Sequence, residues 1–119
     1  MQGTQLIHAF HVPGTLSAGL NIRFTAYRIM TLQHLSAVAS NDSDATLAVG
    51  ISSDTDAILA AAAIGDSAVP VEKTAANWAS TNPTGHINDG DVVVLTLDHD
   101  GASGTAAADV TIVLTFTEG

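Results

Sequence analysis

The amino-acid sequence predicts an all-β fold, and more narrowly an antiparallel, jelly-roll-like β-sandwich. Two stretches near the C-terminus, 92–97 and 110–117, alternate with a period of two and are rich in β-branched residues, as half-buried strands are. About six to eight such stretches, separated by turn-forming residues, recur along the chain, which is typical of a sandwich. With its 119 residues, the chain is expected to form one domain over residues 1–119.

The two C-terminal stretches indicate which side chains face the core. They are predicted to pair as a hairpin across the small and glycine-containing loop 98–108. Because a lone hairpin is unstable in water, the rest of the chain must supply a second sheet or a partner. The predicted core face consists of alternate apolar residues, namely Val93, Leu95, Leu97, Val110, Ile112, Leu114 and Phe116.

The central part of the chain contains further strand patterns. Residues 20–26 alternate cleanly, whereas 27–39 are apolar with a slip in phase that indicates a β-bulge or a bend. A turn at 40–44 then leads into 46–51, whose alternate apolar residues face the core. The segments 27–39 and 46–51 are therefore predicted to form a hairpin.

The alanine-rich stretch 56–64 supports two predictions. Its composition, its acidic start at Asp56 and the following Gly65 favour a short helix with an acidic N-cap and a glycine stop. Its context in an all-β chain favours a further strand, and nine residues are few for a helix. We favour a short helix near residues 56–64. The following residues, 66–89, are rich in turn signals, with one short strand predicted at 69–71.

The charge balance excludes two classes of partner. The chain has twelve acidic and three basic residues and a formal net charge of −9. Nucleic-acid binding needs clustered Lys and Arg, and Arg23, Arg28 and Lys73 are too few for such a cluster. No apolar run approaches the ~20 residues of a membrane span. We therefore expect a soluble protein with neither a nucleic-acid nor a membrane partner.

Acidic loops and histidines are the candidate metal ligands. Asp98, Asp100 and Asp109 occupy positions 1, 3 and 12 of an EF-hand count, but the ligand and glycine positions between them are not matched. Short acidic residues also start turns and keep loop tips hydrated, and we favour this role over calcium binding. His8 and His11 would point to opposite faces of a strand, which disfavours zinc. The sequence predicts no metal site and no cofactor.

The sequence contains no recognisable catalytic constellation. It has no Gly-x-Ser-x-Gly elbow, and no lysine follows Gly101 and Gly104 to make a phosphate loop. Aromatic residues make up only 4% of the chain, too few for the stacking cleft of a glycosidase. Tyr27 and Trp78 could form a sugar platform, although a buried tryptophan and an ordinary tyrosine are the simpler interpretation. We therefore expect a protein that is not an enzyme.

Four stretches of the chain have a distinctive sequence: 10–14 (FHVPG), 46–51 (TLAVGI), 89–101 (DGDVVVLTLDHDG) and 104–116 (GTAAADVTIVLTF). They resemble small β-sandwich virion proteins of tailed bacteriophages, a group of capsid-decorating (cement) and fibre-like proteins. The resemblance implies a jelly-roll-like domain, usually in threefold assemblies, on a capsid lattice. It also implies a location on the capsid surface of the virion, after assembly in the host cytoplasm.

The function implied by this resemblance is structural. We expect a decoration protein that binds and stabilises the capsid shell, with the major capsid protein and sister chains in a homotrimer as partners. The alternative is a fibre or a receptor- or glycan-recognition module of the virion, which would need a groove with aromatic residues. The sparse aromatic residues and the abundant Ala, Val and Thr favour decoration.

Apolar residues outside the predicted core are the candidates for these contacts. Val92, Val94 and Val113 lie on the outward faces of their predicted strands, and a monomer seldom leaves such residues in water. Residues 1–9 are polar apart from two positions, and are predicted to be an N-terminal arm or a short edge strand. The predicted oligomer or capsid interface comprises Leu6, Ile7, Phe10, Val92, Val94 and Val113.

Overall fold

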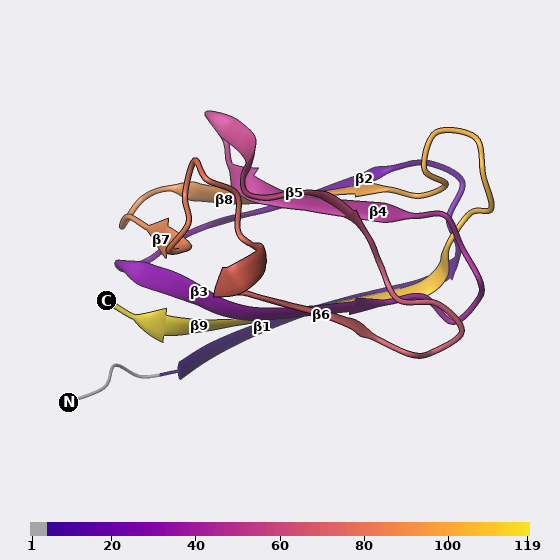
Figure 1. Ribbon diagram of the computed structural model, residues 1–119, viewed down its shortest axis with the longest axis horizontal. Coiled ribbons are helices and arrows are strands. Elements are labelled where there is room, and N and C mark those ends of the chain that lie inside the picture. Colours follow the sequence, from indigo (N-terminus) through magenta and orange to yellow (C-terminus); the bar gives the residue numbers. More distant parts are fainter. Residues whose placement is uncertain (1–4) are drawn as a thin grey trace.

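Two antiparallel β-sheets pack face to face in the computed structural model, which describes residues 5–119 (Figure 1). The predicted all-β sandwich is therefore confirmed. No helix in this described part has the length and apolar character that a membrane-spanning helix requires. The elements in chain order are β1 (Gln5–Thr15), β2 (Leu20–Thr25), β3 (Met30–Val38), β4 (Thr46–Ile51), β5 (Asp54–Ala63), β6 (Val71–Thr74), the 3-10 turn η1 (Ala75–Asn77), β7 (His86–Ile87), β8 (Val92–Asp98) and β9 (Ala108–Glu118).

The strands pair in a nested order. Sheet A has the order β1-β9-β3-β6, with β7 also paired to β3, and sheet B has the order β2-β8-β4-β5. If β7 is left aside, the first strand pairs with the last, β2 with β8, β3 with β6 and β4 with β5. The chain is thus a long two-stranded ribbon folded over on itself. Strands β1 and β2 lie along one lateral edge of the sandwich, and β5 and β6 lie along the other, which faces the viewer in Figure 1.

The core lies between the sheets and has the predicted composition. All seven residues assigned to the core face of β8 and β9 are at most 2% exposed. Their neighbours Thr111, Val113 and Thr115 on the outer face of β9 are only half-buried. The period of two in β9 is thus confirmed residue by residue.

Two predicted hairpins are wrong, because their strands lie in different sheets. Strand β3 belongs to sheet A and β4 to sheet B, and likewise β9 belongs to sheet A and β8 to sheet B. The connections 39–45 and 99–107 are long enough to cross from one sheet to the other. Both are anchored to the core by small buried residues, namely Ala39, Ala45 and Ala107.

The predicted helix at 56–64 is also wrong, since this stretch lies in strand β5 and pairs with β4. Helix propensity separates alanine from the other common residues by less than about 1 kcal/mol per residue, which tertiary pairing overrides. The pairing of β5 is irregular, because its register against β4 shifts twice and leaves consecutive residues such as Ile58 and Leu59 both buried. The predicted slip of phase within 27–39 is confirmed as a register shift between Leu32 and His34.

Candidate interaction surface

The six predicted interface residues do not form one patch. Val92 lies on the outer face of sheet B, whereas Ile7 and Val113 lie on the outer face of sheet A. Only Ile7 is largely exposed, at 65%. Leu6 and Phe10 are half-buried and pack against the core from β1.

The prediction that Val94 faces another chain is wrong, because this side chain is fully buried within its own chain. Val94 pairs with Gly50 of β4, so both residues lie on the outward face of sheet B. A side chain at Gly50 would collide with backbone atoms of Asp54 and Thr55. The start of β5 therefore lies over this face, where the tip of the β4–β5 hairpin stands out from the sheet in Figure 1. Val94 is therefore covered by a segment of its own chain.

The predicted N-terminal arm is a strand over most of its length. Residues from Gln5 onward form β1 and pair with β9 as far as Val12. The alternative prediction of an edge strand is thus confirmed for residues 5–9, although the strand is longer than expected. Residues 1–4 lie outside the described part of the chain.

A cluster of half-buried side chains lies between β1 and β2, along the lateral edge that faces away from the viewer in Figure 1. These side chains reach over the core from both sheets but are not fully covered, and we call them the aromatic edge. They are Leu6, His8, Phe10 and Val12 from β1 and Leu20, Ile22 and Phe24 from β2.

Stacked rings hold the aromatic edge together. The imidazole of His8 stacks on Phe24 with ring centroids 4.7 Å apart, and Phe10 stacks on Phe24 at 5.9 Å. Phe116 closes the cluster from below, with its edge toward Phe24 at 6.2 Å. Tyr27 lies beside His8 at 6.4 Å and is 54% exposed. Four of the five Phe, Tyr and Trp residues of the chain are therefore gathered here.

The strands that carry the aromatic edge also have free hydrogen-bonding edges. Among the described strands, β1 pairs only with β9, and β2 pairs only with β8. Strand β1 contains no Asp, Glu, Lys or Arg, and Pro13 near its end is its one residue without a backbone N–H. Proteins commonly protect an edge strand from pairing with charged side chains or prolines. Most of β1 lacks such protection.

Charge is unevenly distributed along the chain, and sequence reasoning missed this signal. The first acidic residue is Asp42, so all twelve acidic residues lie in 42–119, whereas two of the three basic residues, Arg23 and Arg28, precede it. In the fold, β1, β2 and β3 consequently carry no carboxylate side chain. The strands of the aromatic edge thus contribute no carboxylate of their own, although Asp109 of the neighbouring β9 accepts a hydrogen bond from Gly14 N–H near the end of β1.

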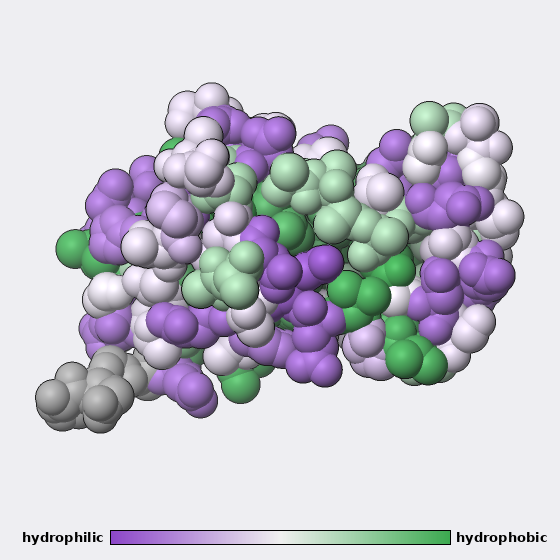
Figure 2. Space-filling view, viewed as in Figure 1, coloured by the Kyte–Doolittle hydropathy of each residue, from purple (hydrophilic) through white to green (hydrophobic). Residues whose placement is uncertain are grey.

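The opposite lateral edge has a different character, and we call it the alanine edge. It comprises β5, β6 and their connection 64–70, with a shallow apolar groove between the two strands (Figure 2). Figure 2 shows apolar residues along β5 and in this groove, with hydrophilic residues on either side. The groove is lined by Leu47, Leu59, Ala62, Ala63, Ile64 and Val71, together with Lys73.

Acidic residues surround the alanine edge. Asp54 and Asp56 lie at the start of β5, Asp66 in the connection and Glu72 on β6. A side-chain hydrogen bond with Asp54 and the repulsion between the two carboxylates raise the pKa of Asp56. Val69 in the connection is 68% exposed. The two lateral edges thus differ in both charge and side-chain size.

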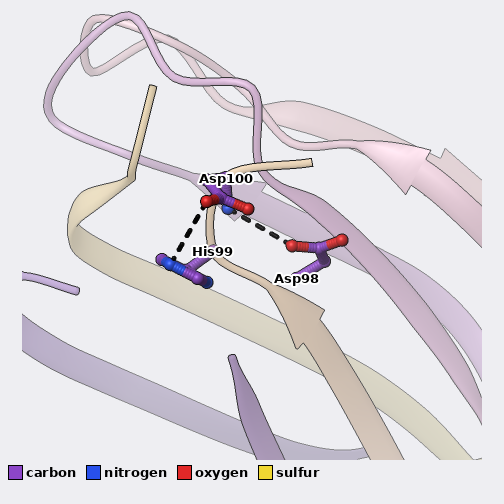
Figure 3. Close-up of side chains that lie close together, drawn as sticks. All are labelled: Asp98, His99 and Asp100. Atoms are coloured by element: carbon purple, nitrogen blue, oxygen red, sulfur yellow. Dashed lines mark hydrogen bonds and ion pairs between the residues drawn. The ribbon is translucent and has the colours of Figure 1, made fainter. Parts of the chain in front are cut away.

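The predicted calcium-type triad is only partly brought together. Oxygen and nitrogen atoms of Asp98, His99 and Asp100 lie within 4.8 Å of one another (Figure 3). The carboxylates already accept backbone N–H groups, since Asp100 N–H donates to Asp98 Oδ1 at 3.3 Å and Ala102 N–H donates to Asp100 Oδ1 at 3.0 Å. Asp109 instead accepts from Gly14 N–H at 2.8 Å and Ser40 Oγ–H at 3.0 Å. The bonds of Asp98 and Asp100 have the turn-stabilising geometry that short acidic residues provide, whereas Asp109 links β9 to segments far away in the sequence.

The other candidate ligands and contact residues are separated. His8 lies in the aromatic edge, whereas the ring of His11 is on the outer face of sheet A, where its Nδ1 is 2.8 Å from Thr111 Oγ1. The predicted opposite orientation of these histidines is confirmed. Trp78 is buried and its indole N–H donates to Leu32 O at 3.1 Å, so Trp78 and the exposed Tyr27 do not form a platform.

The acid stability of the fold should depend on these carboxylates. The N–H of Gly14 is the main group that lowers the pKa of Asp109, and the N–H of Asp100 lowers that of Asp98. Each of these carboxyls has a lower pKa in the folded chain than in the unfolded chain. It therefore stabilises the fold at pH values above its ordinary pKa of 3.8, and this stabilisation is lost as the pH falls through the folded pKa. We expect Asp109→Asn, which suits the positive φ of this residue, to reduce the loss of stability between pH 6 and pH 2.5 in urea titrations. An unchanged pH dependence would contradict the assigned role.

The chain is thus a β-sandwich with two unlike lateral edges, and comparison with a solved structure shows the same fold. The chain is similar to a solved structure described as "Cyanophage Pam1 capsid asymmetric unit", with a TM-score of 0.54 and 12% sequence identity. The match covers 99% of this chain and 87% of the other. At this identity it shows a shared fold. Neither a protein-family model nor a curated protein sequence matches the chain.

Proposed function

We propose that this protein is a non-enzymatic structural protein of a bacteriophage virion, and that it decorates the capsid shell. The observation that carries the proposal is the likeness of nearly the whole chain to the structure described as a cyanophage capsid asymmetric unit. The nested pairing of eight strands in two sheets supports a jelly-roll assignment for the fold. Both agree with the resemblance of four stretches of the sequence to phage decoration and fibre-like proteins.

The proposed partners are sister chains and the major capsid protein, with the chain as a homotrimer at the capsid surface. The unlike lateral edges support an oligomer, because each leaves apolar side chains and unpaired strand edges in water. Threefold assembly is favoured by the resemblance, since capsid lattices offer threefold and quasi-threefold positions. Closed symmetry would also protect the strand edges from open-ended pairing.

Sedimentation with capsid shells tests this function. Purified protein is mixed with empty shells of the phage that encodes it, and the pellet is assayed for saturable binding and for resistance of the shells to heat. We expect binding at a fixed ratio to the major capsid protein and a higher temperature of shell rupture. Ovalbumin, another acidic protein, serves as the control for protein that is trapped non-specifically in the pellet of shells. Absence of saturable binding would overturn the decoration role.

The alternative function is a receptor- or glycan-recognition module of the virion. The observation in its favour is Tyr27, which is exposed and has the guanidinium carbon of Arg28 5.1 Å from its ring centroid. Exposed aromatic rings of this kind can stack on sugars. Binding to a glycan array that Tyr27→Ala abolishes, without saturable binding to shells, would favour this alternative.

A further inference from the structure

We propose that the aromatic edge of one copy of this chain docks head to tail on the alanine edge of a second copy. The inference rests on the proposed homo-oligomer and names the two surfaces that meet. In this contact the aromatic edge of one copy meets the alanine edge of the next. Such a contact differs from a twofold dimer, in which the same edge of each copy would be used.

Strand β1 is a long and uncharged edge strand. Its eleven residues extend over about 37 Å at the rise of an extended strand, along a molecule whose longest dimension is 42 Å. A long edge strand without charged side chains is a template for pairing with another chain. In β2, on the other side of the same edge, Arg23 is the one charged residue. An incoming chain thus meets free backbone groups with little charge to repel it.

The two edges also differ in shape, with aromatic rings on one and a shallow groove on the other. The aromatic edge presents half-buried rings, including His8, Phe10 and Phe24, whose covering would remove further apolar surface from water. The alanine edge presents a shallow groove and small side chains, so the backbone of a partner can approach closely. Lys73 is the one basic residue at this groove, and an aromatic ring is a favourable neighbour for its ammonium group.

The distribution of charge favours a second copy of the chain as the occupant of each edge. With a net charge of −9, two copies repel each other over most of their surfaces. The aromatic edge is the exception, because its strands carry no carboxylate and it has Arg23 beside it. The alanine edge carries Asp56 on β5, Asp66 in the connection and Glu72 on β6. Head-to-tail docking brings these opposite charges together, whereas pairing of two aromatic edges would bring Arg23 against its own copy.

Light scattering on the purified full chain provides the first measurement. The wild type should have a mass of about 36 kDa, three times that of the 12.1 kDa chain. The variant Ile7→Glu/Arg23→Glu adds acidic residues on the exposed faces of β1 and β2 beside the aromatic edge, and Ala63→Glu/Val69→Glu adds acidic residues to the alanine edge, so the two substituted surfaces repel each other. Each variant alone should fall to about 12 kDa. Ser103→Glu, in the exposed loop before β9, adds one acid away from both edges and should leave the assembly intact.

Mixing the two edge variants provides the decisive measurement. Each retains one intact edge, so the mixture should form species of at least about 24 kDa, although neither component associates alone. All four substituted positions are exposed, and equal melting temperatures for monomeric variants would show that the fold survives.

Three results would overturn the inference: a wild type that is a monomer, an edge variant that still assembles, and two monomeric variants that do not associate when mixed. The first of these leaves the proposed function intact if the monomer still binds shells. A trimer that does not bind shells would overturn the proposed function while leaving the head-to-tail contact in place.

Discussion

Replacing Leu114 with alanine is expected to destabilise the protein by about 2–5 kcal/mol, as large-to-small substitutions in a close-packed core do. Leu114 is fully buried in the centre of sheet A, between His8 of β1 and Leu35 of β3 in the pairing register. Truncation would leave a cavity beneath the aromatic edge. Neighbouring strands are fixed on both sides by hydrogen bonds, so the cavity can collapse only in part.

The adjacent residue supplies the matched control for Leu114. Thr115 lies on the outer face of the same strand and is half-buried, so Thr115→Ala should cost well under about 1 kcal/mol. Urea unfolding at one protein concentration compares the two variants, because assembly would make stability depend on concentration. Equal costs would mean that the two faces of β9 are assigned incorrectly.

Gly50→Ala is expected to cost about 1–3 kcal/mol or more, the range for overpacking in a core. A methyl group at this position would collide with the carbonyl oxygen of Asp54 and the carbonyl carbon of Thr55. These are backbone atoms, so the hairpin tip itself would have to move away from sheet B. Such a movement would expose Val94, the partner of Gly50 in the register.

Two measurements separate this mechanism from general destabilisation. Thr96→Ala, on the same outward face of sheet B, should cost less than about 1 kcal/mol. Under conditions where both variants are folded, cleavage by an aspartate-specific protease at Asp54 and Asp56 should be faster in Gly50→Ala than in Thr96→Ala. Cleavage at equal rates would show that the tip does not depend on Gly50.

The sequence allowed prediction of which side chains are buried better than of which strands are neighbours. In β9, alternate residues from Val110 to Phe116 are buried as the period of two predicts. Periodicity contains no information on the partner of a strand, and this is why β8 and β9 were predicted to pair with each other. Their partners lie far away in the sequence, since β9 pairs with β1 and β3.

The candidate surface was predictable only in part. Leu6 and Phe10 were predicted and lie in the aromatic edge, but Phe24 and His8 were assigned no role there. Their meeting depends on strands from two sheets facing each other, which no local pattern reveals. The burial of Val94 depends on a chain segment passing over Gly50. The acid-free start of the chain, by contrast, is visible in the sequence itself.

The nested pairing of the strands has a consequence for how the chain folds during synthesis. The β4–β5 pair joins strands adjacent in sequence, so it can form early and closes the shortest loop. The β1–β9 pair joins residues about a hundred positions apart, so β1 stays without its partner until β9 has been synthesised. We therefore expect ribosome-bound chains that lack β9 to remain protease-sensitive, with β1 becoming protected only once β9 has left the ribosome.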